Sequence, residues 1–301
     1  VWAPMPGGDE PLPVLLWVYG GGFEGGTAVS PVSDPSRFVV EQRVVVVAAN
    51  HRVGALGFAQ LDHRGPRFAE TTNLGLQDVL AALEWASANA SAFGGDPDRI
   101  TVMGHSSGAF LSAALAAVPT ARSLFRRLAL FSGGASRLVP PDAARALADR
   151  VLEALAGQLG TADLEALADA SVSAIVRAQQ SGPARDIGRR NEPSPDAFGV
   201  VLDGAVVTQH PLAAVESGLL QGVDVLVGTT SEEIAGLRGP GPFAPGGFSG
   251  IETEVASWGL DAATAHRVVD HYRTERDADS TREALLTDYV YRLPAARLAH
   301  T

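Results

Sequence analysis

The stretch Arg99–Val118, RITVMGHSSGAFLSAALAAV, decides the fold of this chain. Its first five residues, Arg99 to Met103, predict a short strand, because β-branched and apolar residues dominate them. Gly104 to Gly108 then predict a tight turn. The small apolar residues from Ala109 to Val118 predict a buried helix that Pro119 stops. A strand, a glycine-bounded turn and a helix in direct succession are typical of a sharp elbow that holds a serine exposed at its tip.

The turn itself, Gly104-His105-Ser106-Ser107-Gly108, matches the pattern Gly-x-Ser-x-Gly. Side chains at the flanking positions would collide in so sharp a turn, which explains the glycines. The helix that follows directs its N-terminus at the turn and so favours negative charge developing there. Glycine and serine are common, so the pattern alone also fits an ordinary turn. The strand before it and the helix after it favour Ser106 as a nucleophile.

A second glycine motif, Tyr19-Gly20-Gly21-Gly22-Phe23, follows the apolar run Val14 to Tyr19 and precedes no predicted helix. A dinucleotide-binding loop must open a helix to hold a pyrophosphate, so the motif argues against a Rossmann oxidoreductase. No matching acidic residue ends a second strand either. Bare glycine backbone instead suits an oxyanion hole, in which N–H groups approach a developing oxyanion closely. A plain tight turn is the alternative for the motif taken alone.

Two continuous apolar runs, Val14 to Tyr19 and Val44 to Ala49, indicate buried strands, because such runs are what a parallel sheet covered on both faces requires. Leu128 to Ser132 and Val223 to Thr229 predict two further strands. Together with the strand before Ser106 they alternate with helical patterns, which predicts an α/β fold.

The strongest helical pattern covers Thr72 to Phe93, with Thr72 as the expected N-cap and Gly94-Gly95 as the stop. Residues 140–180 are rich in Ala and Leu and predict a helical excursion of several short segments. Residues 181–195 and 239–250 are rich in Gly and Pro and predict surface loops. We expect a single domain over residues 1–301.

Composition excludes several classes of function. The chain has 301 residues, 46% hydrophobic and 19% charged, and a net charge of −11, which argues against nucleic acid and anionic membrane surfaces. It has no run of the length of a transmembrane helix. The absence of Cys excludes a disulfide, a zinc–thiolate site and a Cys nucleophile. The absence of Lys excludes a phosphate-binding loop, and no His spacing matches a metal motif. We therefore expect no cofactor and no metal.

Four blocks resemble, in order, the type-B carboxylesterases and cholinesterases of the α/β-hydrolase fold. They read LPVLLWVYGGGFEGGT (12–27), VVVVAANHRVGALGF (44–58), NLGLQDVLAALEWASANASAFGGDPDRITVMGHSSGA (73–109) and VDVLVGTTSEE (223–233). The resemblance implies a mostly parallel central sheet with helices on both faces. VWAP at the start resembles the end of an early strand of the family. We therefore expect the domain to be incomplete at its N- and C-terminal ends, with exposed apolar surface as the consequence.

The resemblance also implies roles for site residues. Ser106 matches the family nucleophile, while Gly21, Gly22 and the N–H of Ser107 match its oxyanion hole. This chain departs from the family pattern at three positions. It has His105 where the family usually has Glu, Ser107 where Ala is usual, and His51 where Tyr is common. The choline-binding Trp of the family lies upstream of Val1, so a choline preference has no support.

Glu233 matches the acid of the catalytic triad, which is usually Glu in this family. Its position 127 residues after Ser106 fits the order Ser, acid, His of this fold. Physical reasoning alone does not choose between Glu232 and Glu233, and either acid also suits a solvated helix N-terminus. Position in the resembling block favours Glu233.

A serine hydroxyl is a weak nucleophile until a base takes its proton. The candidate bases are His51, His63, His105, His210, His266, His271 and His300. In the family the catalytic His follows the acid by more sequence than remains here, so the resemblance implies that none of the seven is the base. His105 adjoins Ser106, but neighbours across an elbow diverge. His266 and His271 fit a helix surface, and His300 fits a helix position.

The expected function is hydrolysis of a small carboxylic ester through an acyl-enzyme formed on Ser106. The alternative is a catalytically inactive, cholinesterase-like binding protein or an inactive fragment. Such binding proteins typically lose the nucleophile, and the intact Ser106 disfavours that alternative for the parent protein. The sequence assigns no compartment and no oligomeric state.

Overall fold

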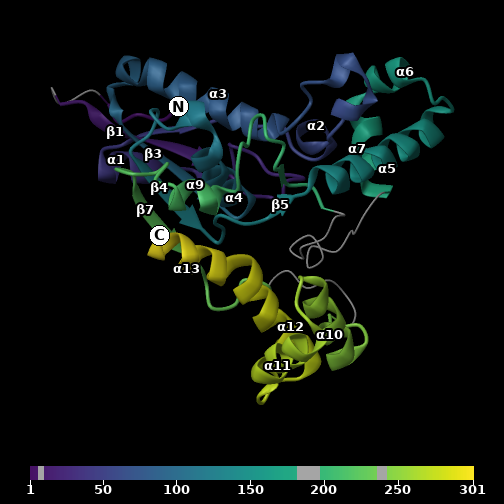
Figure 1. Cartoon of the computed structure of the whole chain (residues 1–301). Coiled ribbons are helices and arrows are strands. Elements are labelled where there is room, and N and C mark those ends of the chain that lie inside the picture. The colour runs from purple at the N-terminus through teal and green to yellow at the C-terminus, as the bar shows by residue number, and fades with distance from the viewer. Residues whose placement is uncertain (6–9, 182–196, 236–242) are drawn as a thin grey trace.

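The computed structural model describes residues 1–5, 10–181, 197–235 and 243–301. Its centre is a five-stranded sheet in the order β2-β1-β3-β4-β7, with every neighbouring pair parallel (Figure 1). The strands are β1 (Leu12–Val18), β2 (Val45–Ala48), β3 (Gly95–His105), β4 (Arg127–Phe131) and β7 (Asp224–Gly228). Each predicted strand is confirmed, and β3 extends beyond the predicted Arg99–Met103 at both ends. A small parallel sheet pairs β5 (Leu138–Val139) with β6 (Val200–Val201).

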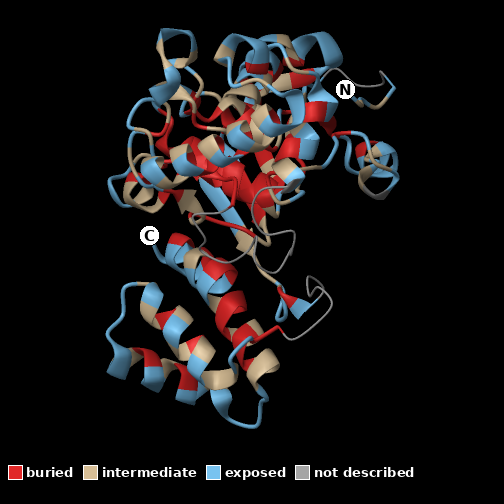
Figure 2. Ribbon diagram, turned by 90° about the vertical axis from the view of Figure 1, so that its right-hand side faces the viewer, coloured by how far each residue is buried: buried red, intermediate tan, exposed pale blue. Residues whose placement is uncertain are grey.

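One face of the central sheet is buried along β1 to β4, whereas Val225 of the edge strand β7 is 37% exposed on it. The register places Val14 opposite Val45 and Ile100, and Leu16 opposite Val47 and Val102, so their side chains share a face. All of them belong to the main core cluster. Figure 2 shows that buried residues concentrate around this sheet. Burial of β-branched and Leu side chains here supplies the main favourable term of folding.

Helices α3 (Leu74–Asn89) and α4 (Ser107–Ala114) contribute to this core through Leu76, Leu83 and Leu111. The predicted helix over Thr72–Phe93 is confirmed in its extent, since a 3₁₀ turn continues α3 through Phe93. The predicted N-cap is wrong. Asn73, in a left-handed conformation, occupies the cap position, and the Thr72 hydroxyl donates to Asp203 instead.

The opposite face of the sheet carries Leu15, Trp17 and Met103, which are partly exposed. Helix α1 (Ser36–Gln42) packs on this face through Val39, which clusters with Trp17 and Leu15. Helices thus lie on both faces, as the α/β-hydrolase expectation requires. A short helix α2 (Ala55–Phe58) follows β2, and α9 (Pro211–Glu216) precedes β7.

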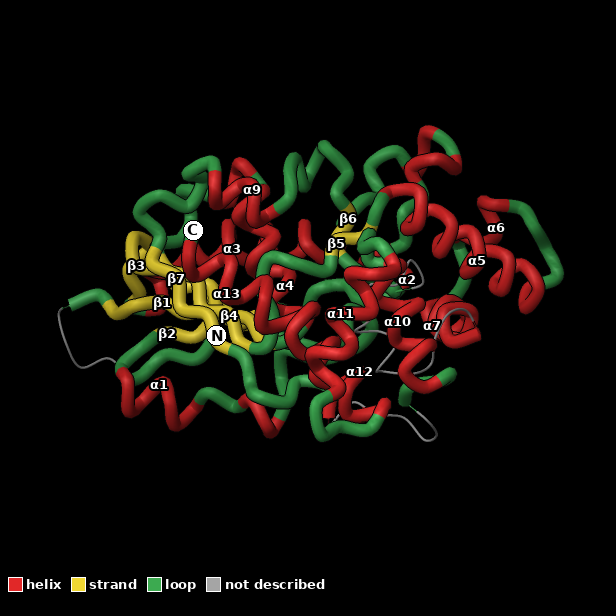
Figure 3. Tube along the Cα trace, turned by 60° about the horizontal axis from the view of Figure 1, so that its bottom comes forward, coloured by secondary structure: helices red, strands yellow, loops and turns green. Residues whose placement is uncertain are grey.

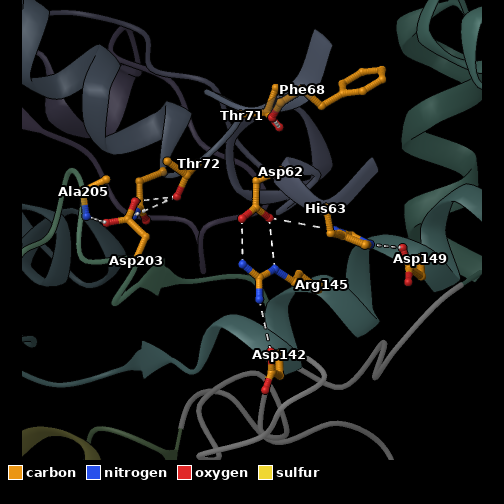
Figure 4. A network of polar contacts seen from close by, with 11 residues as sticks. Asp62, His63, Phe68, Thr71, Thr72, Asp142, Arg145, Asp149, Asp203 and Ala205 are labelled. Carbon is orange, nitrogen blue, oxygen red and sulfur yellow. Dashed lines mark hydrogen bonds and ion pairs between the residues drawn. The ribbon is translucent and has the colours of Figure 1, made fainter. Parts of the chain in front are cut away.

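The helical excursion predicted over residues 140–180 is confirmed. It consists of α5 (Pro141–Leu159), α6 (Leu164–Ala168) and α7 (Val172–Ser181). Figure 3 shows this excursion at the end of the molecule opposite to the strands. Polar contacts fasten it to the body: Arg145 of α5 donates to both oxygens of Asp62, at 3.1 and 2.7 Å (Figure 4). The loop predicted at 181–195 lies outside the described residues, apart from Ser181 at the end of α7.

The C-terminal part forms a separate group of helices, α10 (Gly247–Ser257), α11 (Ala262–Arg273) and α12 (Ala278–Leu286), with its own core around Val255 and Val269. A π-helical turn, Thr287–Arg292, and α13 (Leu293–His300) lead back to the sheet at β7 (Figure 1). The predicted loop at 239–250 is wrong at its end, because α10 already begins at Gly247. Residues 239–242 lie outside the described part. Within the described residues, the structure contains no helix long and apolar enough to cross a membrane.

Candidate active site

Ser106 occupies a strained turn between β3 and α4. Its φ of 53° and ψ of −125° are unfavourable for a residue with a Cβ. The turn is fixed on both sides, because the Ser106 N–H donates to the Phe131 carbonyl at 2.9 Å and its own carbonyl accepts from Ala109 at 2.8 Å. Strained backbone held by its surroundings is characteristic of functional sites. The sequence motif therefore adopts the elbow geometry that it predicts.

The flanking glycines have no room for side chains. A Cβ at Gly104 would lie 2.3 Å from the Gly108 carbonyl oxygen, and a Cβ at Gly108 would lie 2.1 Å from that of Val18. Both distances are far below van der Waals contact. The Gly-x-Ser-x-Gly pattern is thus a steric requirement of packing this turn against β1.

The glycine loop after β1 lies directly against the elbow. A Cβ at Gly20 would lie 2.9 Å from the Cβ of Ser106. Gly21 and Gly22 have φ values of 143° and 64°, which only glycine adopts readily, and the Gly21 carbonyl accepts from Gly25 at 3.1 Å. Gly21, Gly22 and Ser106 thus line one cavity.

Ser106 and the glycine loop line a cavity of about 840 Å³. The cavity runs from the elbow over the partly exposed sheet face, where Trp17 and Met103 form its floor, and Phe38 of α1 forms part of its wall. His105 also lines it. Ser107 and Glu233 are not in its lining. Ser107 is buried at the first position of α4, where helix amides have no partner within the helix, so its N–H is a candidate donor.

Glu233 lies in the loop after β7, two strands away from β3 in the sheet. Because the carboxyl ends of parallel strands meet at one edge, Glu233 and Ser106 are on the same edge of the sheet. Its Oε1 accepts from the Thr230 N–H at 2.7 Å. Glu233 is half-buried and contributes to the raised pKa of Tyr291, whereas Glu232 is exposed. This difference in burial favours Glu233 as the acid that belongs to the site.

Six of the seven histidines have hydrogen-bond or ring partners other than Ser106 and Glu233. His271 makes an edge-to-face contact with Tyr272. His51 stacks on Tyr19, and four ring nitrogens bond elsewhere: His63 with Asp149, His210 with Leu212 N–H, His266 with Glu252 and His300 with the Ala296 carbonyl. His266 and His271 are exposed on α11, as predicted. Among the described residues, no histidine makes a hydrogen bond or ion pair with Glu233, whose Oε1 accepts from the Thr230 N–H instead.

His51 belongs to the scaffold behind the glycine loop. Its ring stacks on Tyr19 at 4.2 Å between centroids, and its carbonyl accepts from the Tyr19 hydroxyl at 2.9 Å. Burial lowers the pKa of His51 to about 4, an effect that the nearby Asp78 opposes. Its ring is therefore uncharged at neutral pH and packs as an aromatic group. Burial likewise raises the pKa of Tyr19, so both rings stay neutral.

The described residues contain no group of three or more His, Asp or Glu side chains that would bind a metal. The chemistry available at the elbow is that of a hydroxyl beside clustered backbone amides. Sequence analysis missed Arg137 and Tyr291, which lie near the glycine loop and the nucleophile helix. No motif marks either residue, because each reaches the site only through tertiary packing.

Comparison with known proteins agrees with this geometry. The carboxylesterase family matches residues 1–301. The para-nitrobenzyl esterase of Bacillus subtilis (strain 168) is 34% identical over 222 residues, which are 74% of this chain and 44% of that relative. The fumonisin B1 esterase of Sphingopyxis macrogoltabida is 37% identical over 237 residues, 77% of this chain and 41% of that relative.

Solved structures give the same result. A para-nitrobenzyl esterase superposes with a TM-score of 0.84 at 29% identity, covering 99% of this chain and 61% of its own. A Geobacillus stearothermophilus carboxylesterase superposes with a TM-score of 0.80 at 31% identity. The match covers 99% of this chain and 60% of that carboxylesterase. This chain thus spans less than two thirds of these relatives. From the match over its whole length, the chain belongs to the carboxylesterase family.

Proposed function

We propose that the protein hydrolyses small carboxylic esters through an acyl-enzyme formed on Ser106. One observation carries the proposal: Ser106 sits in a strained elbow whose Cβ faces a bare glycine loop at the end of a cavity of about 840 Å³. An esterase needs this combination, because the attacking oxygen and the oxyanion donors must lie within a few ångströms of one carbonyl.

In the proposed reaction, Ser106 Oγ attacks the acyl carbonyl carbon while its proton passes to a histidine base. The carbonyl oxygen becomes an oxyanion that the N–H groups of Gly21, Gly22 and Ser107 stabilise. Collapse of the tetrahedral intermediate expels the alcohol, which takes the proton from the base. Water then attacks the acyl-enzyme by the same route and releases the acid. Glu233 orients the base.

We propose that the base is a histidine other than the seven in this chain. Most of those have partners elsewhere. His105 lines the cavity but is the last residue of β3, so its side chain leaves the backbone one residue before Ser106. Substitution of His105 tests this assignment directly.

The substrate is proposed to be an ester with an aromatic or aliphatic group. Trp2, Trp17, Tyr19 and Phe38 line the cavity beside Ser106. Walls of this kind favour an apolar substrate, because binding removes the substrate's apolar surface from water. One relative is named for para-nitrobenzyl esters, and an aromatic ester is therefore the first substrate to try.

The test is labelling with a fluorophosphonate, read by intact mass, of the wild-type chain and Ser106→Ala. Ser107→Ala is the matched control, because it removes the neighbouring hydroxyl and keeps the backbone N–H. In a longer natural protein that supplies the base, we expect one adduct on wild type and on Ser107→Ala, and none on Ser106→Ala. Hydrolysis of para-nitrophenyl esters is then measured for the same three proteins.

The outcomes separate the parts of the proposal. Labelling that persists in Ser106→Ala rejects Ser106 as the nucleophile. Labelling of wild type that is lost in His105→Gln makes His105 the base and rejects our assignment. A folded wild-type chain that stays unlabelled, but labels when produced within a longer natural protein, supports a base outside these 301 residues. An unlabelled longer protein rejects esterase activity.

A further inference from the structure

Arg137 lies beside two aromatic rings that belong to the two halves of the site. Its Cζ is 5.8 Å from the ring centroid of Phe23 and 5.7 Å from that of Phe110. The two rings lie 6.4 Å apart with an interplanar angle of 29°. Phe23 directly follows Gly22 in the glycine loop, and Phe110 is on the first turn of α4, where its N–H donates to the Ser106 carbonyl at 3.1 Å. The guanidinium thus touches the loop and the nucleophile helix at once.

The charge of Arg137 is also held by polar partners. Its guanidinium hydrogen-bonds the hydroxyl of Tyr291, a residue 2% exposed in the π-helical turn. Glu24, the next residue of the glycine loop, attracts the same cation. Burial raises the pKa of Tyr291 to about 12, and the nearby Glu233 acts in the same direction. Arg137 therefore connects the loop, the nucleophile helix and the segment beside the candidate acid.

The backbone shows that this placement is enforced. Arg137 has a φ of 60°, in the left-handed region that costs a residue with a Cβ about 1 kcal/mol or more. The preceding residue, Ser136, donates to the Val290 carbonyl at 3.0 Å, next to Tyr291. The surrounding structure holds the arginine in an unfavourable conformation that directs it toward the two rings.

We propose that Arg137 is a positioning residue, which holds the glycine loop against the nucleophile helix through Phe23, Phe110 and Tyr291. The proposal rests on the proposed esterase function, because it assigns Arg137 to the alignment of that site. Cation–π contact with two neighbouring rings and a hydrogen bond to Tyr291 restrain the position of the planar guanidinium. Without it, Phe23 loses its cationic neighbour, and Gly21 and Gly22 lose an anchor at the adjacent position.

The experiment compares Arg137→Met, Arg137→Lys and Tyr291→Phe with the control Arg145→Met. Arg145 is a partly exposed arginine ion-paired with Asp62, in the polar network that ties α5 to the body (Figure 4). The substitutions are made in the longer natural protein, which supplies the proposed base, and each protein is assayed for kcat and KM on an aromatic ester. Hydrogen exchange of the peptide that contains residues 19–25 gives a readout that does not need activity.

We expect Arg137→Met to lower kcat by about 10- to 100-fold and to change KM by less than about threefold, because misplaced oxyanion donors lose transition-state contacts. Arg137→Lys keeps the charge but not the planar fork, so it should recover only part of the loss. Exchange of residues 19–25 should become faster in Arg137→Met. Arg145→Met should leave both kcat and this exchange unchanged.

Chemical rescue separates alignment from a general loss of stability. Ethylguanidinium added at millimolar concentration to Arg137→Ala should restore part of kcat, and should do nothing for Arg145→Ala. A kcat for Arg137→Met within twofold of the control rejects the proposal. If the wild-type chain neither hydrolyses esters nor labels, the exchange measurement still decides: unchanged loop exchange rejects the positioning role, and faster exchange supports it without the esterase function.

Discussion

The ring of His51 is uncharged at neutral pH, because burial holds the pKa of this histidine at about 4. In the unfolded chain a histidine titrates near 6.5. Above pH 6.5 both states are neutral, and the stabilisation from packing the neutral ring on Tyr19 is fully present. As the pH falls from 6.5 to about 4, the unfolded state takes up the proton first, so the free energy of unfolding decreases. Below about pH 4 both states are protonated and this loss stops.

His51→Phe should remove that dependence. The phenyl ring keeps the stacking surface for Tyr19 and has no proton to bind. Between pH 7 and pH 4.5 we expect wild type to lose up to about 3 kcal/mol more unfolding free energy than the variant. Urea unfolding at the two pH values measures the difference. Equal losses in the two proteins would show that His51 is accessible to protons in the folded state.

Glu232 and Glu233 are neighbours of the same chemistry, and only their surroundings separate them. Glu233→Gln should lower kcat by about 10³-fold or more, since a triad acid orients and stabilises its base. Glu232→Gln, on the exposed side of the same loop, is the matched control and should keep kcat within about twofold. Steady-state kinetics on an aromatic ester measures both. The reverse ranking would assign the role to Glu232.

At the scale of elements, the elbow depends on close contact between α4 and β1. A Cβ at Gly108 would meet the Val18 carbonyl at 2.1 Å, so Gly108→Ala must displace the helix that carries the nucleophile turn. We expect a loss of about 2 kcal/mol or more in unfolding free energy, and loss of fluorophosphonate labelling.

Gly157→Ala is the control in α5. A Cβ there has no heavy atom within 4 Å, and alanine is the better helix former. This substitution should raise the free energy of unfolding by about 0.5–1 kcal/mol. Thermal unfolding of both variants measures the contrast. A stable, active Gly108→Ala would show that the turn tolerates a side chain.

Asp203 joins α3 to the segment after β6. Its Oδ1 accepts three backbone N–H groups, those of Ala205, Val206 and Val207, at 2.9–3.0 Å. Its Oδ2 accepts from Thr72 and Asn73 at 2.5 and 2.9 Å (Figure 4). One carboxylate therefore satisfies five donors on two segments that are far apart in sequence.

Asp203→Ala should lower the free energy of unfolding by about 2–4 kcal/mol, because several donors lose their acceptor at once. Asp142→Ala is the control, since that carboxylate is exposed and its partner among the described residues is the exposed side of Arg145. Urea unfolding should place the control within about 0.5 kcal/mol of wild type. Similar urea midpoints for the two variants would show that water satisfies the donors that lose the Asp203 carboxylate.

At the scale of the whole molecule, the two faces of the sheet differ. One is sealed by α3 and α4. The other is open over Trp17 and Met103, and Leu226 on the edge strand β7 is 61% exposed on that face. Open apolar surface beside an unpaired edge strand favours association between copies.

Leu226→Lys should reduce that association, because a charge on an edge strand resists pairing. Leu159→Lys, at an exposed position at the end of α5, is the control and should have no effect. Sedimentation velocity over a range of concentrations measures the average mass. If wild type stays monomeric throughout, the open face does not drive association in this chain.

The sequence by itself determined the sheet and the elbow. Continuous apolar runs such as Val14 to Tyr19 indicate buried strands, and Gly104 is required by sterics within the turn itself, where a Cβ would meet the Gly108 carbonyl. The glycine loop was predictable for the same reason, since its backbone geometry is local. Tertiary structure decided the rest. Asn73 rather than Thr72 begins α3 because Asp203, far away in sequence, accepts the Thr72 hydroxyl. The placement of Arg137 depends on a contact between segments 154 residues apart, which no local pattern encodes.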